Sequence, residues 1–446
     1  MAGRLKSLYP TGGLWHHGDF MKLWAGQSIS EFGTAVSQLA IPLVAVIILK
    51  ASAFEVAALG TVQFLPFLLF TLPAGVWVDR LSRRLVLIVG DAGRALLLAS
   101  IPAAYVADVL TLGQLYAVAF LAGILTVFFD VAYQAYLPSL VEREHLVEGN
   151  SKLQVTVSGA QIAGPGLAGA LISAISAPYA IVVDAISFVV SGGFTVAIQK
   201  RERLPEKPAD GNKPRMRTEL WEGLRYVLRH RYLLPQAIST GTSNFFTNLL
   251  FAIYVVYAVR SLHLSAALIG VAFMGGGIGW LLGSLFANRL GSALGLGRAT
   301  ILGAGLCGPS ELLVPLAPHS FPLPFLIASG IGSGFGAVVY NIQQVSLRQA
   351  ITPERMQGRM NAVMRFLVWG TIPLGSLTGG ALASTIGLRA TLFVGALGTV
   401  LAAVPIALSP VRHVKELPTE PEEVPMLGDA LLPTQAAGLT PEGPAA

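Results

Sequence analysis

Residues 56–84 read VAALGTVQFLPFLLFTLPAGVWVDRLSRR, and this stretch decides the fold. Val56–Val78 carries no charged side chain, and it is long enough to cross the hydrocarbon of a bilayer, which takes about 20 apolar residues as a helix. Charge returns at once with Asp79-Arg80, and then with Arg83-Arg84. The stretch therefore predicts a membrane-spanning helix that ends in a basic turn.

The whole chain has the same character. Only 12% of its 446 residues are charged, whereas soluble domains carry about 25%. Hydrophobic residues make up 53%, more than a globular core can bury without a large exposed apolar patch. This composition excludes a soluble enzyme and a disordered regulator, and the single cysteine, Cys307, excludes an internal disulfide. We therefore expect membrane lipid to surround most of the chain.

Placing turns at charges and at Gly/Pro clusters divides the chain into twelve apolar segments of helical length. Because no alternating strand pattern appears, we predict an all-α polytopic membrane protein with twelve transmembrane helices in two six-helix bundles. The predicted spans are Leu23–Leu49, Val56–Val78, Leu85–Val106, Gln114–Tyr136, Leu153–Ile175, Tyr179–Gln199, Leu233–Val259, Ala266–Asn288, Ala299–Ala317, Leu323–Leu347, Asn361–Ile386 and Thr391–Leu408.

The basic residues predict the orientation of these spans. Of the 30 Lys and Arg, 25 fall in turns on one side, and only Lys50, Arg260 and Arg389 fall on the other. Since Lys and Arg concentrate in cytoplasmic loops, we expect a multi-pass protein of the cell membrane with both termini in the cytoplasm. The cytoplasmic loops then account for the positive net charge, and we expect no nucleic-acid partner.

A polar stretch at residues 200–218, KRERLPEKPADGNKPRMRT, marks a linker between two sets of six spans. Behind it, Leu220, Leu224 and Val227 share one face of a short helix, which either lies on the membrane surface or extends the next span. Matches at an offset of 208, Gly75 with Gly283 and Pro165 with Pro373, suggest that the second set repeats the first. The predicted division is an N-terminal segment at 1–22, bundles at 23–199 and 232–409, a linker with its amphipathic helix at 200–231, and a disordered tail at 410–446.

The turn after the second predicted span has the pattern Gly75-x-x-x-Asp79-Arg80-x-Ser82-Arg83-Arg84. It resembles the loop motif of the major facilitator superfamily, with Ser82 where the family has glycine. The resemblance implies a twelve-helix transporter of the major facilitator fold. It also implies a conformational latch formed by Gly75, Asp79, Arg80, Arg83 and Arg84, with Gly75 allowing two helices to approach closely.

A second pattern lies in the fifth predicted span, where residues 160–169 read Ala-x-x-x-Gly164-Pro165-x-x-Ala-Gly169. It is similar to the antiporter motif of the same superfamily, with alanine at two glycine positions. Gly164, Pro165 and Gly169 would form a hinge that faces the other bundle, because proline removes a backbone hydrogen bond. The stretches at 183–188, 219–230, 343–349 and 358–361 further resemble the branch containing macrolide and enterobactin exporters, a resemblance that covers residues 23–408.

Ionisable residues inside predicted spans are candidate functional groups, because burying them in a membrane is costly. Glu31 is the first candidate for proton coupling, since it lies beside a polar stripe in the first span, and Glu311 in the ninth span is the second. Asp91 has Arg94 three residues on and is equally consistent with a structural ion pair. Asp184, expected near the outer end of the sixth span, is equally consistent with helix packing or capping.

Polar and aromatic side chains in the spans are candidates for lining a central cavity. They are Gln27, Thr34, Gln38, Phe245, Asn248, Tyr254 and Asn341. Any one of them is equally compatible with helix packing. No spacing typical of a metal site or an ATP-binding P-loop occurs, so we expect no metal and no cofactor.

These patterns predict a secondary active transporter and no enzymatic activity. We expect proton-coupled efflux of amphipathic small molecules, such as antibiotics or siderophores, by alternating access of a monomer in lipid. A proton-coupled importer on the same fold is the alternative, and the Gly-Pro pattern of the fifth span weighs against it. A channel is disfavoured because the charges form no repeated ring.

Overall fold

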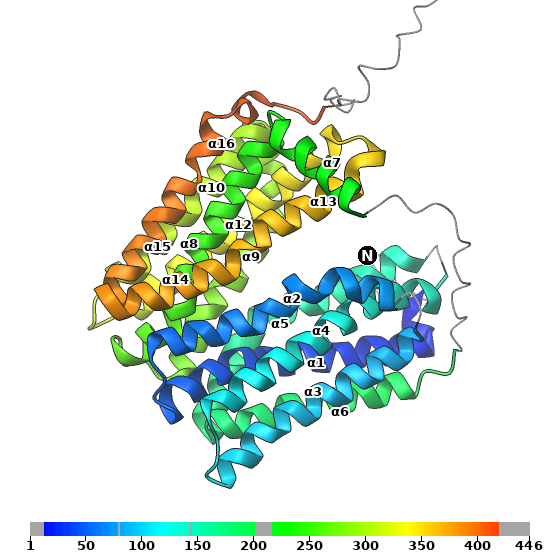
Figure 1. The fold of residues 1–446 in the computed structure, drawn as a ribbon, viewed down its shortest axis with the longest axis vertical. Coiled ribbons are helices and arrows are strands. Elements are labelled where there is room, and N and C mark those ends of the chain that lie inside the picture. The colour runs from blue at the N-terminus through cyan, green and yellow to red at the C-terminus, as the bar shows by residue number, and fades with distance from the viewer. Residues whose placement is uncertain (1–12, 79–80, 143–144, 201–215, 419–446) are drawn as a thin grey trace, which may run out of the picture.

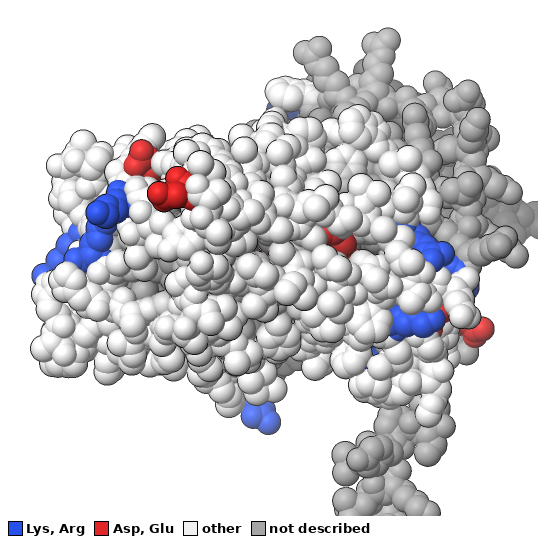
Figure 2. Space-filling view, turned by 90° about the horizontal axis from the view of Figure 1, so that it is seen from below, with Lys and Arg blue, Asp and Glu red and all other residues white. Residues whose placement is uncertain are grey.

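The structure is a computed structural model that describes residues 13–78, 81–142, 145–200 and 216–418. Every regular element in this part of the chain is helical, and twelve helical segments within it are long and apolar enough to cross a membrane. The all-α, twelve-span architecture is therefore confirmed. Charged side chains lie mainly toward two ends of the molecule, with a wide uncharged band between them (Figure 2).

The elements follow the predicted spans with shifts of a few residues. The first half has a 3₁₀ turn η2 (Leu14–His16), α1 (Gly18–Leu43) with a π turn η3 (Val44–Ile48), α2 (Ala53–Val78), α3 (Arg83–Val106), α4 (Leu112–Leu140), α5 (Leu146–Ile175) and α6 (Ala177–Val196). The second half has α7 (Met216–Arg229), α8 (Leu233–Arg260), α9 (Ala266–Leu294), α10 (Leu296–Glu311), α11 (Leu313–Leu316), α12 (Leu323–Ile351), α13 (Glu354–Trp369), α14 (Thr371–Ile386), α15 (Leu388–Ala402), α16 (Val404–Leu408) and a 3₁₀ turn η5 (Pro410–His413).

The long helices pack in two groups, which Figure 1 shows as the blue-to-teal part and the green-to-orange part of the molecule. In the first group α1 packs on α5 and α6, and α4 packs on α2 and α3. In the second group α8 packs on α14 and α15, and α12 packs on α9 and α10. The groups meet where α5 crosses α9 and where α2 crosses α14. We call the two groups the N-half and the C-half.

Glycine determines how closely helices approach within the C-half. Gly275, Gly279 and Gly283 recur every four residues on α9 and face α12, and a Cβ built on any of them would collide with the α12 backbone. Small residues at this spacing allow membrane helices to pack backbone to backbone. The glycine-rich composition of this span is therefore explained by packing.

In the described part of the chain, the two helix crossings between the N- and C-halves lie toward one end of the molecule. We call this the closed end, and it carries Lys50, Arg260 and Arg389; α1, α3 and α5 begin at the other end, which carries Arg83 and Arg84 and which we call the basic end. At the closed end, Arg260 Nη2 of α8 donates to the Ala51 carbonyl across the halves at 2.6 Å. The halves therefore diverge toward the basic end.

The segment after the linker is a separate helix. His230–Tyr232 interrupt the chain between α7 and α8, so α7 does not extend the next span. It lies against α13 (Figure 1), with Val227 and Tyr226 buried and Trp221 exposed. One amphipathic face of this helix is therefore covered by the C-half itself.

The first residues of the predicted disordered tail differ from that expectation. Residues 410–418 are ordered because η5 packs on α10, and the amides of Leu296 and Gly297 donate to the carbonyls of Lys415 and Val414. These bonds satisfy two of the amide groups that the first turn of α10 leaves without helical partners. Residues 419–446 lie outside the described part of the chain.

Candidate functional site

A cavity of about 600 Å³ lies where the two halves diverge. The N-half contributes Gln38 of α1 and Gln161 and Pro165 of α5, while most of the wall comes from α8, α9, α10 and α12 of the C-half. We call it the central cavity. Its volume is in the range of small-molecule sites, which run from about 300 to 1,000 Å³.

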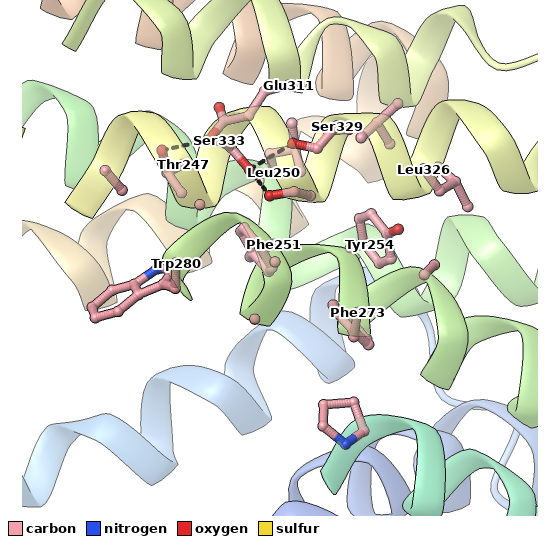
Figure 3. A pocket seen from close by; sticks show the side chains of 18 of the residues that line it. Thr247, Leu250, Phe251, Tyr254, Phe273, Trp280, Glu311, Leu326, Ser329 and Ser333 are labelled. Atoms are coloured by element: carbon pink, nitrogen blue, oxygen red, sulfur yellow. Dashed lines mark hydrogen bonds between the residues drawn. The ribbon is translucent and has the colours of Figure 1, made fainter. Parts of the chain in front are cut away.

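Four aromatic side chains form the apolar wall of the central cavity. Phe251 and Tyr254 project from α8, and Phe273 and Trp280 from α9 (Figure 3). The ring centroids of Tyr254 and Phe273 are 5.0 Å apart, and those of Phe251 and Tyr254 are 5.9 Å apart. Rings at these separations offer large, flat apolar surface, which suits the hydrophobic part of a small organic ligand.

Glu311 is the acidic group of the central cavity. It is the last residue of α10, and its side chain is 4% exposed. The hydroxyl of Thr247 donates to Glu311 Oε1 at 2.9 Å (Figure 3), and Thr399 lies 3.5 Å from that hydroxyl. Among the described residues no Lys, Arg or His forms an ion pair with it. A carboxyl buried without a cation is costly to keep charged, so Glu311 is suited to bind a proton or a cationic ligand.

A proline inside a span often breaks the helix, but the break in the ninth span lies after Glu311 and not at Pro309. Pro309 lies inside α10, and the helix is interrupted only at Leu312 before the short helix α11. Ser310 next to Glu311 donates to the carbonyl of Leu306. The carboxyl therefore projects from the end of a helix, close to the bundle interior.

Three of the predicted cavity or coupling residues line the central cavity, namely Gln38, Tyr254 and Glu311. Asn341 lines an adjoining cavity of about 440 Å³ nearer the basic end. The remaining predicted cavity residues, which are not among those lining the central cavity, are Gln27, Thr34, Phe245 and Asn248. They have other contacts: Gln27 donates to Glu31, Asn248 to the Asn244 carbonyl, and Phe245 packs edge-on against Phe246.

Several residues of the cavity were missed by the sequence reasoning. Thr247 and Thr399, which flank Glu311, lie on different helices that only the fold brings together. Phe273 and Trp280 are two of the three aromatic residues of a span otherwise rich in glycine and aliphatic side chains, and this contrast is a signal that could have found them.

The acidic candidates of the N-half lie away from the central cavity. Asp91 and Arg94 of α3 form an ion pair of 2.6 Å in which both residues are buried. Asp184 of α6 is 1% exposed and accepts from the hydroxyl of Ser187 at 3.1 Å. It lies two helical turns inside α6 against Gly33 of α1, so helix packing describes its position and capping does not. Glu31 is half-buried, and its Oε1 accepts from Gln27 at 2.8 Å.

Part of the predicted latch lies outside the described residues, namely Asp79 and Arg80. Arg83 donates to the carbonyl of Ala135 at 3.0 Å, and Arg84 donates to that of Val196 at 2.7 Å, so both hold neighbouring helix ends of the N-half. Among the described residues, no neighbouring helix comes within 4 Å of a Cβ built at Gly75. The close helix approach expected at Gly75 is therefore not made by the described part of the chain.

The Gly-Pro segment of α5 lies at the crossing between the halves. A Cβ built at Gly270 of α9 would collide with the carbonyl of Pro165, and one built at Gly169 would lie 2.5 Å from the carbonyl of Ala266. Gly164 faces Ala35 of α1 within its own half. Pro165 and Gly169 therefore face the other half, and the helix runs unbroken through them from Leu146 to Ile175.

Comparisons with known proteins agree on one family. Residues 14–434 match the major facilitator family described as transmembrane secretion effector. The chain is 27% identical to the multidrug efflux pump Tap of Mycolicibacterium fortuitum, over 83% of this chain and 91% of that protein. It is also 27% identical to macrolide efflux protein A of Streptococcus pyogenes, over 89% of this chain and 97% of that one. A bacterial homologue of the iron transporter ferroportin has the same fold, with a TM-score of 0.71 at 17% identity, over 87% and 98% of the two chains.

Proposed function

Because this chain belongs to the transmembrane secretion effector family of major facilitator transporters, we propose that it exports amphipathic small molecules in exchange for protons. The central cavity carries this proposal. It joins an aromatic wall to the buried carboxyl of Glu311, so it offers one surface for an apolar ligand and one group that can exchange a proton. The efflux proteins to which the chain is similar support the direction of transport.

In this proposal the basic end faces the cytoplasm, together with both termini, as the distribution of Lys and Arg favours. The structure then represents a state open to the cytoplasm, because the halves touch at the closed end and diverge at the basic end. Rocking of the halves about the α5–α9 and α2–α14 crossings would move the cavity to the other face of the membrane. The latch at residues 75–84 would hold the basic end shut in that second state.

Two carboxyls remain candidates for the proton. Glu311 is our first choice, because it lines the cavity and has no cationic partner among the described residues. Glu31 is the second choice, since it is half-buried and hydrogen-bonded to Gln27. Asp91 and Asp184 are less suited, because Asp91 is paired with Arg94 and Asp184 is buried against α1 and hydrogen-bonded by Ser187.

The test uses everted membrane vesicles that contain the full chain and a pH-sensitive dye. After respiration has acidified the lumen, a macrolide and a lipophilic cationic dye are added in separate runs. We expect each transported compound to release protons from the lumen, and we expect Glu311→Gln to reduce this release at least about tenfold, since a positioned acid–base group contributes about 10²–10⁴-fold to a proton-transfer rate. Glu222→Gln, which removes a half-exposed carboxyl on α7, is the matched control.

The outcomes separate the two candidates and the two directions. Loss of release in Glu31→Gln with full release in Glu311→Gln would move the proton site to α1. Accumulation of the substrate inside vesicles of the native orientation would contradict export and favour the importer.

A further inference from the structure

Beyond the central cavity, two adjoining cavities lead toward the basic end, with volumes of about 440 and 470 Å³. The first shares Asn244, Trp280 and Cys307 with the central cavity. The second extends between α13 and the aromatic face of α2, where Phe64 and Phe67 lie. Both are lined by Arg348 of α12 and Arg365 of α13. The two arginines therefore line both cavities that lie between the central cavity and the basic end.

Arg348 and Arg365 have no acidic partner in the part of the chain that the structure describes. The two guanidinium groups lie close enough for their charges to repel. Nε of Arg348 is buried and has no acceptor in the described part of the chain. Two neighbouring cations, one of them partly enclosed by protein, repel each other, and an anion between them would offset that repulsion.

The position of Arg348 argues against an ordinary role at the membrane surface. Arginines at a span's end usually extend toward the lipid headgroups, where water and phosphate satisfy them. The Nε group of Arg348, by contrast, is enclosed by protein. Gln344, one turn earlier, is 5% exposed, lines the same cavity and has an Oε1 without a partner among the described residues. The arginine belongs to a polar chamber inside the protein.

The surrounding groups complete a site for a small acid with an aromatic or apolar body. Trp369 lines both cavities, and the guanidinium of Arg365 lies 5.5 Å from the centre of its ring. Tyr340 and Thr240 share a hydrogen bond of 2.6 Å on the opposite wall. Guanidinium groups bind carboxylates and phosphates through paired hydrogen bonds, and a neighbouring indole offers stacking surface.

We propose that Arg348 and Arg365 form an anion-binding subsite on the path from the basic end to the central cavity, which takes the carboxylate or phosphate group of an amphipathic ligand. The proposal rests on the transport function proposed above, because it names the chemical class of ligand that enters the same path. The anionic group can belong to a soluble substrate or to a lipid headgroup, and the chemistry recognised is the same for both.

The test is a binding measurement that requires no transport. Isothermal titration calorimetry is done on the full chain in phosphatidylcholine nanodiscs, with 1-naphthaleneacetate and with its neutral counterpart 1-naphthaleneacetamide. We expect the acid to bind more tightly than the amide in the wild-type protein. Arg365→Gln and Arg348→Gln should weaken binding of the acid by about 10- to 100-fold, the size of one charge-assisted hydrogen bond, and change binding of the amide less than about twofold.

Three further variants sharpen this result. Arg348→Lys and Arg365→Lys keep the charge but lose the paired geometry, so each should weaken binding of the acid less than glutamine does. Arg289→Gln removes an exposed arginine of α9 near the same end and should leave both probes unchanged. If Arg348→Gln fails to fold, Arg365→Gln still decides the question, because Arg365 is exposed to the cavity.

A second set of nanodiscs identifies the source of the anion. If phosphatidylglycerol in the disc weakens binding of the acid to the wild-type protein but not to Arg365→Gln, lipid headgroups occupy the subsite; equal affinity in both discs assigns it to soluble ligands. The proposal would be overturned if the wild-type protein bound the acid and the amide with equal affinity. It would also be overturned if each glutamine variant weakened binding of the acid and of the amide by the same factor. Anion preference without any export would instead contradict the proposed function and leave the subsite standing.

Discussion

The two halves of this transporter bury charge in opposite ways. In the N-half, Arg94 pairs with Asp91 at 2.6 Å, and its guanidinium lies 4.1 Å and 4.2 Å from the ring centres of Phe129 and Phe188. In the C-half, Glu311 has no cation and Arg348 no carboxylate among the described residues, and both line cavities. Charge that is compensated inside a bundle holds helices together, whereas uncompensated charge at a cavity is available to a ligand or a proton.

The largest effect that tests this comparison is expected at Arg94. Its side chain also lies in the field of Asp130 on α4 and Asp184 on α6. Arg94→Met leaves these buried carboxyls without their cation, so we expect the free energy of unfolding to fall by about 3–5 kcal/mol, as measured by SDS-induced unfolding in mixed micelles.

The matched control replaces the whole pair. Asp91→Leu combined with Arg94→Met also removes the carboxyl that pairs directly with Arg94, so it should recover part of the lost stability, while Asp130 and Asp184 still lack their cation. A stability for Arg94→Met within about 1 kcal/mol of the wild-type value would show that the pair is not a structural element and would remove the contrast between the halves.

The two crossings between the halves offer a second comparison. Pro165 on α5 and Pro373 on α14 are 208 residues apart, and each places its carbonyl against a helix of the other half. The carbonyl of Pro165 lies against Gly270 of α9, where no side chain fits, while the carbonyl of Pro373 accepts from the hydroxyl of Thr61 at 3.4 Å. At Pro165 the contact is backbone to backbone, whereas at Pro373 there is room for a side chain; the second crossing has its own close backbone contact, between Gly380 of α14 and Phe54 of α2.

We therefore expect Gly270→Val to disturb this conformation much more than Thr61→Val does. An added isopropyl group against the Pro165 carbonyl should cost about 1–3 kcal/mol, the usual range for overpacking, and should open the closed end. Thr61→Val removes the long hydrogen bond to the Pro373 carbonyl and the hydroxyl's bond to the Ala57 carbonyl within α2, and it should cost at most about 1 kcal/mol.

The measurement is a distance distribution between spin labels at Leu85 of α3 and Leu294 of α9, two exposed residues near the basic end, in a protein with Cys307→Ala. Gly270→Val should shift the population toward shorter distances, because opening the closed end brings the basic ends together. Identical distributions in Gly270→Val and wild type would show that the α5–α9 contact does not select the state.

The fold was largely predictable from sequence, and the physical reason is the bilayer. An uncharged run such as Val56–Val78 can span lipid only as a helix, and charges such as Glu55 and Asp79 mark its ends. The presence of each transmembrane helix could therefore be predicted directly. The offset between Pro165 and Pro373 also identified two positions that lie at equivalent crossings. Single-residue placement at helix ends was less accurate because caps and loop contacts, such as those of η5, depend on neighbours distant in sequence.

The site was only partly predictable, because a cavity wall is assembled from several helices. Glu31 and Glu311 look alike in sequence, and only packing shows that Glu311 lines the central cavity. Arg348 was assigned to a cytoplasmic turn, since the distribution of positive charge explained it without any further role. Its burial became visible only with α13 and α2 in place beside it.

A smaller comparison concerns the segments that precede each half. Leu14 of η2 donates its amide to Glu148 in the first turn of α5 at 3.2 Å, and Glu148 also pairs with Lys152 at 3.3 Å. In the C-half, Glu222 of α7 pairs with Arg359 in the second turn of α13. Each half thus fastens its preceding segment to the start of its fifth helix through a glutamate.

Both contacts are partly exposed, so we expect modest losses of stability that differ between the halves. Glu222→Gln should cost about 0.2–1 kcal/mol, as for other exposed ion pairs. Glu148→Gln should cost about 0.5–1.5 kcal/mol, since it also weakens a hydrogen bond from a backbone amide. Hydrogen exchange of the amides of α7 and of residues 14–17 measures both losses, and the reverse order would contradict the assigned contacts.

The smallest change in stability is expected at Glu311, although we place it at the centre of transport. Glu311→Gln keeps an acceptor for the Thr247 hydroxyl and buries no charge, so the free energy of unfolding should change by less than about 1 kcal/mol. The same variant should lose substrate-driven proton release in vesicles. Arg94→Met and Glu311→Gln, measured side by side by SDS-induced unfolding and by proton release in vesicles, would then separate charge that supports the fold from charge that serves the ligand. A destabilised Glu311→Gln would place Glu311 with the structural group, because its carboxyl would then be holding α8, α10 and α15 together.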